Sequence, residues 1–108
     1  MLEIYTVSLR VVRAVSAMEA RVRARNAGLA DQLVRACISM PLNIAEGGGQ
    51  RNGNRTQRYL TALGSARETE AALDVACAVG VIDGIDAQLK RDLDHVIGVL
   101  VSVTRRTR

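Results

Sequence analysis

The sequence is very poor in aromatic residues: Tyr5 and Tyr59 are the only two among 108 residues, and there is no Phe or Trp. A core without large rings has to be built from Leu, Val, Ile and Ala, and Ala allows helices to pack closely. Apolar residues still make up 48% of the chain, so a single domain of this length has enough of them for one core. Disorder of the whole chain is therefore not expected.

Cysteine and histidine are also scarce, with Cys37, Cys77 and His95 as the only examples. Two Cys and one His cannot provide the four ligands of a structural zinc site within one chain. Because no secretory signal precedes the cysteines, we expect both to be reduced and buried in a cytoplasmic protein, with a disulfide or a metal pair as the minor alternative. No apolar run reaches the roughly 18 residues of a membrane-spanning helix.

The sequence contains no recognisable catalytic or cofactor motif. His95 is predicted on the polar side of a helix, and no Ser or Cys nucleophile can be matched to it. The glycine-rich segment 47–54 lacks the Gly-Lys-Ser/Thr of a phosphate-binding loop and follows a predicted helix, which favours a plain connector. A di-iron bundle would need Glu-x-x-His motifs on two helices. We therefore expect a protein that is not an enzyme and needs no metal or cofactor.

Apolar residues recur every three or four positions along most of the chain, which predicts amphipathic α-helices. The first stripe consists of Ile4, Val7, Val11, Val15, Met18 and Val22. Four helices joined by short connections predict an all-α, antiparallel up-down four-helix bundle, with residues 1–108 as one domain. We expect these buried core positions on the other helices: Leu33, Leu63, Leu73, Val96 and Leu100.

Local signals set the expected helix boundaries. The first helix covers about residues 3–25, with Asn26 and Gly28 as a left-handed stop, and the second covers about 29–46. After the loop 47–54, Asn54 with Gln57 resembles a capping box that opens the third helix, which ends at Gly80. Asp83 or Asp86 caps the fourth helix. Pro41 lies inside the second stripe, so we expect a kink there in preference to two short helices.

The net charge of +4 is unevenly distributed. Residues 1–67 carry ten Arg against four acids, whereas residues 68–104 carry two basic residues against seven acids. The basic half either contacts an acidic partner such as nucleic acid or pairs with the acidic half of the same or a neighbouring chain. If nucleic acid is bound, the candidate phosphate-contacting residues are Arg10, Arg13, Arg21, Arg51, Arg55 and Arg58.

Several polar residues lie beside or within the predicted core stripes: Arg35, Asn43, Glu46, Glu68 and Glu70. Antiparallel pairing of the second and third helices brings Arg35 level with residues 67–70. We therefore predict an ion pair of Arg35 with Glu68 or Glu70, with a structural role that fixes the helix register.

Two segments resemble the motifs of a known family. Residues 33–47, from Leu33-Val34-Arg35 through Met40-Pro41-Leu42-Asn43-Ile44-Ala45-Glu46-Gly47, are similar to the central motif of the four-helix-bundle proteins, also called 23S rRNA intervening-sequence proteins. A second family motif, Gly-Ser-x-x-Glu-x-Glu-x-x-Leu, is matched by Gly64, Ser65, Glu68, Glu70 and Leu73. The resemblance covers about residues 5–104.

The resemblance implies an antiparallel four-helix protomer of bacterial origin that assembles as a ring-shaped homopentamer. It also implies a relation to the accessory proteins of diversity-generating retroelements, which act with a reverse transcriptase and nucleic acid. The chain departs from the family after Glu46-Gly47, where an aromatic and two basic residues are usual and residues 48–52 read Gly-Gly-Gln-Arg-Asn. This departure argues against recognition by base stacking but leaves phosphate contact by Arg open.

Surplus apolar residues favour self-association. A second ridge on the first helix and three further residues on the fourth exceed what one small protomer can bury: Tyr5, Leu9, Val12, Ile97, Val99 and Val101. Two functions follow as hypotheses. The first is a non-catalytic homopentamer that binds RNA or DNA through its basic surface, as an accessory to a reverse transcriptase or an RNA element. The second is a protein-interaction scaffold without nucleic-acid binding.

Overall fold

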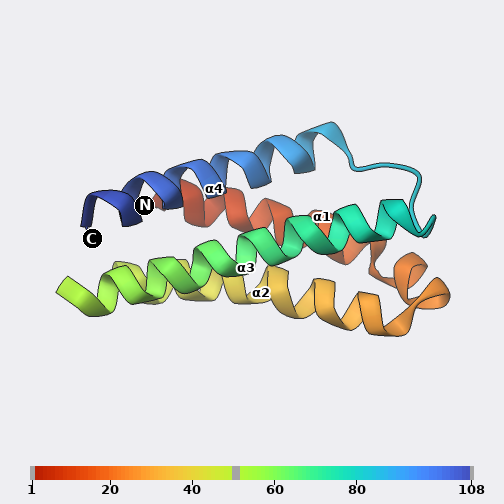
Figure 1. Ribbon diagram of the computed structural model, residues 1–108, viewed down its shortest axis with the longest axis horizontal. Helices are drawn as coiled ribbons and strands as arrows, with labels where there is room; N and C mark the ends of the chain where they lie inside the picture. Colours follow the sequence, from red (N-terminus) through yellow and green to blue (C-terminus); the bar gives the residue numbers. More distant parts are fainter. Residues whose placement is uncertain (1, 50–51, 108) are drawn as a thin grey trace.

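The structure is a computed structural model that describes residues 2–49 and 52–107. It contains four helices: α1 (Leu2–Arg25), α2 (Ala27–Gly48), α3 (Asn52–Ala78) and α4 (Ala87–Thr107). Figure 1 shows that successive helices run in alternate directions, so that both ends of the chain lie at the same end of the molecule. The described residues form no strand. The predicted all-α bundle is confirmed.

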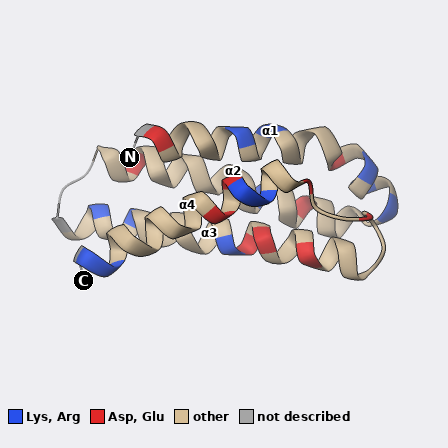
Figure 2. Cartoon of the chain, turned by 90° about the horizontal axis from the view of Figure 1, so that it is seen from above, with Lys and Arg blue, Asp and Glu red and all other residues tan. Residues whose placement is uncertain are grey.

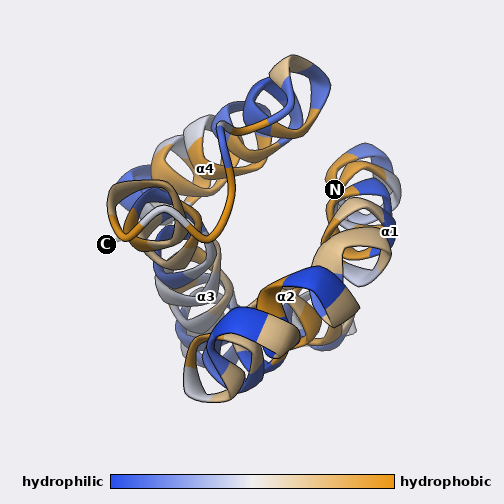
Figure 3. Cartoon of the chain, turned by 90° about the vertical axis from the view of Figure 1, so that its right-hand side faces the viewer, coloured by the Kyte–Doolittle hydropathy of each residue, from blue (hydrophilic) through white to orange (hydrophobic). Residues whose placement is uncertain are grey.

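The four helices pack in a closed cycle around one core. Helix α2 packs against α1 and α3, and α4 packs against α3 and α1. Viewed from one end, the helices lie at the corners of a quadrilateral and turn much of their hydrophobic surface inward (Figure 3). Each helix therefore has two neighbours and buries its apolar stripe between them.

The predicted core is largely correct. Five of the six residues in the first stripe are buried, and Met18 is half-buried. On the other helices, Leu33, Leu73, Val96 and Leu100 are inaccessible to solvent, whereas Leu63 is only half-buried. Alanines fill much of the α3 contribution, since Ala62, Ala66 and Ala76 are fully buried.

The boundary between the first two helices differs from the prediction. Asn26 does not end α1 in a left-handed conformation; its backbone is extended, and its side-chain oxygen accepts a hydrogen bond from the Leu29 N–H at 2.9 Å. Asn26 is thus the N-cap of α2, and Gly28 lies inside that helix. An Asn side chain satisfies an unpaired N–H at a helix start as readily as it tolerates a left-handed stop, so its residue type fits both roles.

The predicted loop 47–54 is much shorter than expected. Helix α2 continues through Gly48, and α3 already begins at Asn52. Asn54 therefore lies within the first turn of α3, and the expected Asn54–Gln57 capping box is wrong. Glycine content suggested an extended loop here, but tertiary packing of the two helix ends against each other overrides that local preference.

Pro41 lies inside one continuous helix, so the alternative of two short helices is wrong. The kink stays a prediction. Pro41 is buried together with Met40, on the side of α2 that faces the core.

The signals around the last connection are confirmed. Gly80 has a φ of 79°, the left-handed conformation that favours glycine, and its N–H bonds to the Cys77 carbonyl at 3.1 Å. Of the two predicted caps for α4, Asp86 is the one used: its carboxylate accepts hydrogen bonds from the N–H groups of Gln88 and Leu89.

The surplus apolar surface is not where the sequence predicted it. The extra residues on α1 and α4, such as Leu9 and Val101, are half-buried within the protomer. Among the described residues, the large apolar side chains that are exposed lie instead on α2, on late α3 and just beyond the end of α3: Ile38, Leu42, Val75 and Val79, between 44% and 61% accessible.

Candidate nucleic-acid interface

Arg10 is engaged within the protomer. Its guanidinium donates two hydrogen bonds to the carboxylate of Asp92 on α4, at 2.9 and 3.2 Å. The Asp92 side chain is almost fully buried, and the hydrogen bond from Arg10 lowers its pKa below the usual range, assisted by one from Gln88. This bidentate pair ties α1 to α4. Arg10 therefore has a structural contact in the protomer, and its role as a phosphate contact stays a prediction.

The predicted arginines around the α2–α3 junction have mixed positions. Arg58 forms an ion pair with Glu46 at 3.0 Å, which links α3 to the end of α2. Arg55 is exposed near the start of α3. Arg51 lies outside the described residues. The sequence pattern therefore located a basic segment correctly but did not anticipate that Glu46 neutralises part of it.

Two of the six candidates, Arg13 and Arg21, are exposed on α1 and make no hydrogen bond or ion pair within the described residues. Arg25, Arg105 and Arg106, which are not among the six candidates, are also exposed. Figure 2 shows basic residues gathered at the end of α1 and at the opposite end of the bundle, on early α3 and late α4, with acidic residues along the middle of α3. Figure 2 also shows basic residues in the middle of α1 and at the start of α4, and acidic residues at the end of the bundle where α1 ends.

One arginine of the basic half, Arg10, pairs with an acid of the acidic half, Asp92, whereas Lys90 belongs to the acidic half and pairs within it. Besides Arg10–Asp92, Lys90 lies 3.8 Å from Asp94 and 4.0 Å from Glu70. At the start of α1, Glu3 contacts His95 at 3.0 Å. The arginines at the ends of the helices lie away from most of these contacts.

The polar residues predicted beside the core do not form one network. No ion pair joins Arg35 to Glu68 or Glu70 in the described part of the chain, so that prediction is wrong for the protomer. Arg35 and Glu68 instead line one hollow of about 160 Å³ between α2 and α3. The predicted register is right, because the two residues are level. The side chains stay apart because both are exposed and water solvates each charge.

Next to Arg35 and Glu68, the polar contact between α2 and α3 is made by two serine hydroxyl groups, and Asn43 and Thr69 add hydrogen bonds within each helix. The hydroxyl groups of Ser39 and Ser65 are 2.8 Å apart, and the amide of Asn43 donates to the Ser39 carbonyl at 2.9 Å and hydroxyl at 3.1 Å. Thr69, fully buried, donates to the Ser65 carbonyl. Serine next to alanine on a helix face gave only a weak signal for this contact.

Gly47 has a packing role that its place in a glycine-rich segment concealed. The Tyr59 ring lies against the Gly47 backbone so closely that a Cβ atom there would overlap it. Both residues are buried. The absence of a side chain at Gly47 therefore allows α2 and the start of α3 to approach, and one of the two aromatic residues of the chain fills the space.

Neither cysteine is paired. Cys37 is buried, and burial raises the pKa of its thiol to about 11, so the reactive thiolate is suppressed near neutral pH. Cys77 is half-buried. The predicted burial is confirmed for Cys37 and is wrong for Cys77, and the reduced state stays a prediction.

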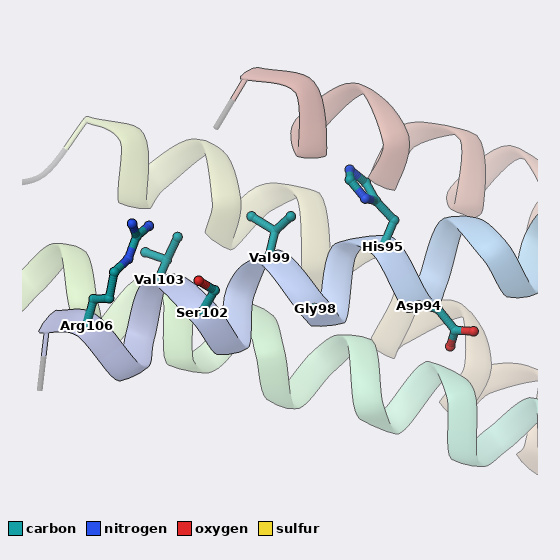
Figure 4. A pocket seen from close by; sticks show the side chains of 7 residues that line it. All are labelled: Asp94, His95, Gly98, Val99, Ser102, Val103 and Arg106. Atoms are coloured by element: carbon teal, nitrogen blue, oxygen red, sulfur yellow. The ribbon is translucent and has the colours of Figure 1, made fainter.

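A shallow hollow of about 380 Å³ runs along α4. Figure 4 shows His95, Val99, Val103 and Arg106 projecting from the same side of the helix, with Asp94 pointing away. Gly98, which has no side chain, and Ser102, whose side chain is small, also line the hollow. Its wall is therefore a row of half-buried valines with a charged group at one end.

Comparison with known proteins identifies the family of this chain. The family model described as 23S rRNA-intervening sequence protein matches residues 1–102. The chain belongs to this family. The resemblance seen in the two motifs is thus confirmed over nearly the whole sequence, including Asn43, Glu46, Ser65 and Glu68.

A solved structure supports the fold of this 23S rRNA-intervening sequence protein. A protein of unknown function from the S23 ribosomal protein family of Bacteroides thetaiotaomicron superposes with a TM-score of 0.80. The two share 19% sequence identity, and the match covers 94% of this chain and 97% of the other. No curated protein matches the sequence. In the described residues, no helix has the length and apolar character needed to cross a membrane.

Proposed function

We propose that this protein is a non-catalytic homo-oligomer that binds nucleic acid through phosphate contacts made by exposed arginines. The observation that carries the proposal is the presence of exposed arginines on early α3 and late α4 at one end of the bundle and on late α1 at the other, where Arg21 and Arg25 form no ion pair within the described residues (Figure 2). Arginine recognises phosphate oxygens with two parallel N–H groups, which favours a polyanionic partner. The family description, which refers to an intervening sequence of 23S rRNA, supports the same class of partner.

The expected readout is nearly independent of sequence. Tyr59 is buried and Tyr5 is half-buried, so neither ring is available as an exposed stacking platform. None of the helices carries the motifs that read base edges in a groove. Contacts to the phosphate backbone supply affinity and position, with little information about base identity.

Self-association is the second part of the proposal, with five protomers as the expected number from the family resemblance. Support comes from exposed Ile38 and Leu42, one turn apart on α2, and from the valine-lined hollow on α4 (Figure 4). These are different surfaces, and contacts between unlike surfaces generate closed rings when the rotation allows it. A ring repeats each weak arginine contact, so avidity raises the affinity for a long polyanion.

The resemblance to accessory proteins of diversity-generating retroelements extends the proposal to a cellular role. In that role the protein acts as an accessory of a reverse transcriptase or of an RNA element. The alternative function is a scaffold for another protein. Two exposed valines, Val75 on α3 and Val79 just beyond its end, favour it, because the second half of α3 is acidic and would repel nucleic acid.

The experiment that tests the proposal measures binding of RNA and DNA oligonucleotides at about 50 and 200 mM salt. We expect binding at the lower salt, with log affinity falling by about 0.7–0.9 per phosphate contact for each unit of log salt. A combined Arg55→Glu, Arg105→Glu and Arg106→Glu variant should bind more weakly. Arg91→Glu, on the exposed side of α4 among acidic neighbours, is the control and should bind almost like the wild type.

Two outcomes would overturn the proposal. Absence of binding at 50 mM salt by an intact assembly would favour the scaffold. Light scattering that shows a monomer at micromolar concentration would refute self-association, whereas a stable dimer would refute only the number five.

A further inference from the structure

A hollow of about 260 Å³ lies where the end of α1 meets the α3–α4 connection. Two arginines of α1, Arg21 and Arg25, form one side of it, and residues 80–84 form the other. This is the end of the bundle that faces the viewer in Figure 3. More of its lining is polar than apolar, unlike the valine-lined hollow on α4.

The two arginines form a concentration of positive charge without a carboxylate partner. Arg21 and Arg25 are four residues apart, so they lie on the same face of α1, where like charges repel each other. Neither forms an ion pair within the described residues. Arg23, between them in sequence, is different: its guanidinium contacts Glu19 and Asp31, each at 2.8 Å. Two of three neighbouring arginines are therefore available to an anion.

The opposite wall is held in place by the core. Val81 and Ile82 are buried, and their N–H groups bond to the Ala76 carbonyl at 2.9 and 3.3 Å. The next residues, Asp83 and Gly84, are exposed, and their N–H groups make no hydrogen bond in the described structure. The connection thus offers two unused N–H donors directly after a segment that is held by the core.

The basic residues at this helix end also complement the α1 dipole. That effect accounts for a positive charge in the last turn, but it applies equally to Arg23, which is neutralised. It does not account for two unpaired arginines that line one hollow together with residues whose N–H groups are not hydrogen-bonded in the described structure.

We infer that this hollow binds a phosphate group, with Arg21 and Arg25 as charge-assisted donors and the backbone of Asp83 and Gly84 as further donors. The inference rests on the proposed nucleic-acid function and assigns it a site, in which a backbone phosphate of the bound strand occupies the hollow. Asp83 opposes the anion, because its own carboxylate lines the same space.

The experiment compares an Arg21→Glu/Arg25→Glu variant with Arg23→Glu, which changes the adjacent residue. A single-stranded RNA oligonucleotide serves as the probe at about 50 mM salt. We expect the double variant to lose at least about tenfold in affinity and its salt slope to fall by about 0.7–0.9 for each lost phosphate contact. Arg23→Glu should lose clearly less, because Arg23 is neutralised, and Asp83→Asn should bind more tightly than the wild type.

A second measurement is independent of the oligonucleotide. Titration of the wild type with inorganic phosphate, followed by NMR, should shift the Gly84 amide signal and leave that of Gly64 unchanged. Arg23→Glu reverses one charge and the double variant reverses two, so a logarithmic loss of affinity in the double variant no greater than twice that of Arg23→Glu would overturn the site, because only net charge would then matter. A silent Gly84 amide would overturn it as well. If no variant and no wild type bind RNA while phosphate shifts Gly84, the proposed function fails and the phosphate site stands.

Discussion

The α2–α3 pair and the α1–α4 pair solve the same packing problem with different side chains. Between α2 and α3 the contact is made by small residues, with Ser39 hydrogen-bonded to Ser65 and Gly47 beneath the Tyr59 ring. Between α1 and α4 the core is formed by branched aliphatic residues such as Val11 and Leu100, and charged contacts such as Arg10–Asp92 lie at the margin.

The difference shows which interactions specify each contact. Small residues allow a close approach, so hydroxyl groups and a missing Cβ decide the register of α2 against α3. Branched aliphatics tolerate more variation in position, and a bidentate ion pair then fixes α1 against α4. Both family motifs lie on α2 and α3, where steric tolerance is smallest.

The largest expected effect comes from the aliphatic core that both pairs share. Leu33→Ala, Leu73→Ala or Leu100→Ala removes a fully buried side chain and should lower the free energy of unfolding by about 2–5 kcal/mol. Urea unfolding followed by circular dichroism measures it. Leu42→Ala, at a side chain 61% accessible, is the control and should change little in the isolated protomer, within about 0.5 kcal/mol. Equal losses at Leu42 and Leu100 would contradict the burial pattern.

The close approach of α2 and α3 predicts that two Gly→Ala changes act in opposite directions. Gly47→Ala places a Cβ against the Tyr59 ring and should destabilise the fold by about 1–3 kcal/mol. Gly64→Ala, in α3 with open space around it, should stabilise by about 0.5–1 kcal/mol through helix propensity. Thermal unfolding of both variants decides this. Destabilisation by both would mean that space at Gly47 is not the controlling factor.

The hydroxyl contact between the same helices should have a smaller effect. Ser65→Ala leaves the Ser39 hydroxyl without its partner on α3 and should lower stability by about 0.5–1.5 kcal/mol. A double-mutant cycle with Ser39→Ala isolates the coupling between the two residues. Ser16→Ala, on the exposed side of α1, serves as the control. Additive losses, without coupling, would show that the hydrogen bond does not hold the helices together.

The α1–α4 ion pair should give the smallest effect, because Arg10 is about half exposed and water screens the interaction. The Asp92 pKa is lower in the folded state, so its contribution is present above the unfolded pKa of about 3.9 and is lost as the pH falls through the folded pKa. Wild type should therefore be more stable than Asp92→Asn at pH 7 and equal to it near pH 2. A difference that persists at the lower pH would exclude the ionised pair as its source.

Sequence patterns were most informative where one residue type has one structural role. The apolar stripe from Ile4 to Val22 fixed the buried face of α1, and Gly80 marked the end of α3, because a positive φ strongly favours glycine. They were least informative for residues with two roles. Asn26 fits both a stop and a cap, and the glycines near residue 48 fit both a loop and a close helix contact.

The candidate site also shows what local sequence patterns can and cannot reveal. The local excess of Arg was visible in the sequence, and it pointed to α1 and to the α2–α3 junction. Which arginines remain available was not visible, because Asp92 is 82 positions away from Arg10 and Glu46 lies on a different helix from Arg58. Arg25 was missed because its importance depends on the distant connection 80–84.

The sequence by itself determined the helical class, the number of helices, most of the core and the family, since periodicity and local motifs are properties of neighbouring residues. Only the tertiary structure decided which charges are neutralised, where apolar surface remains exposed and where two arginines meet free backbone donors. These features depend on pairs of residues brought together by packing, and short-range patterns carry little information about such pairs.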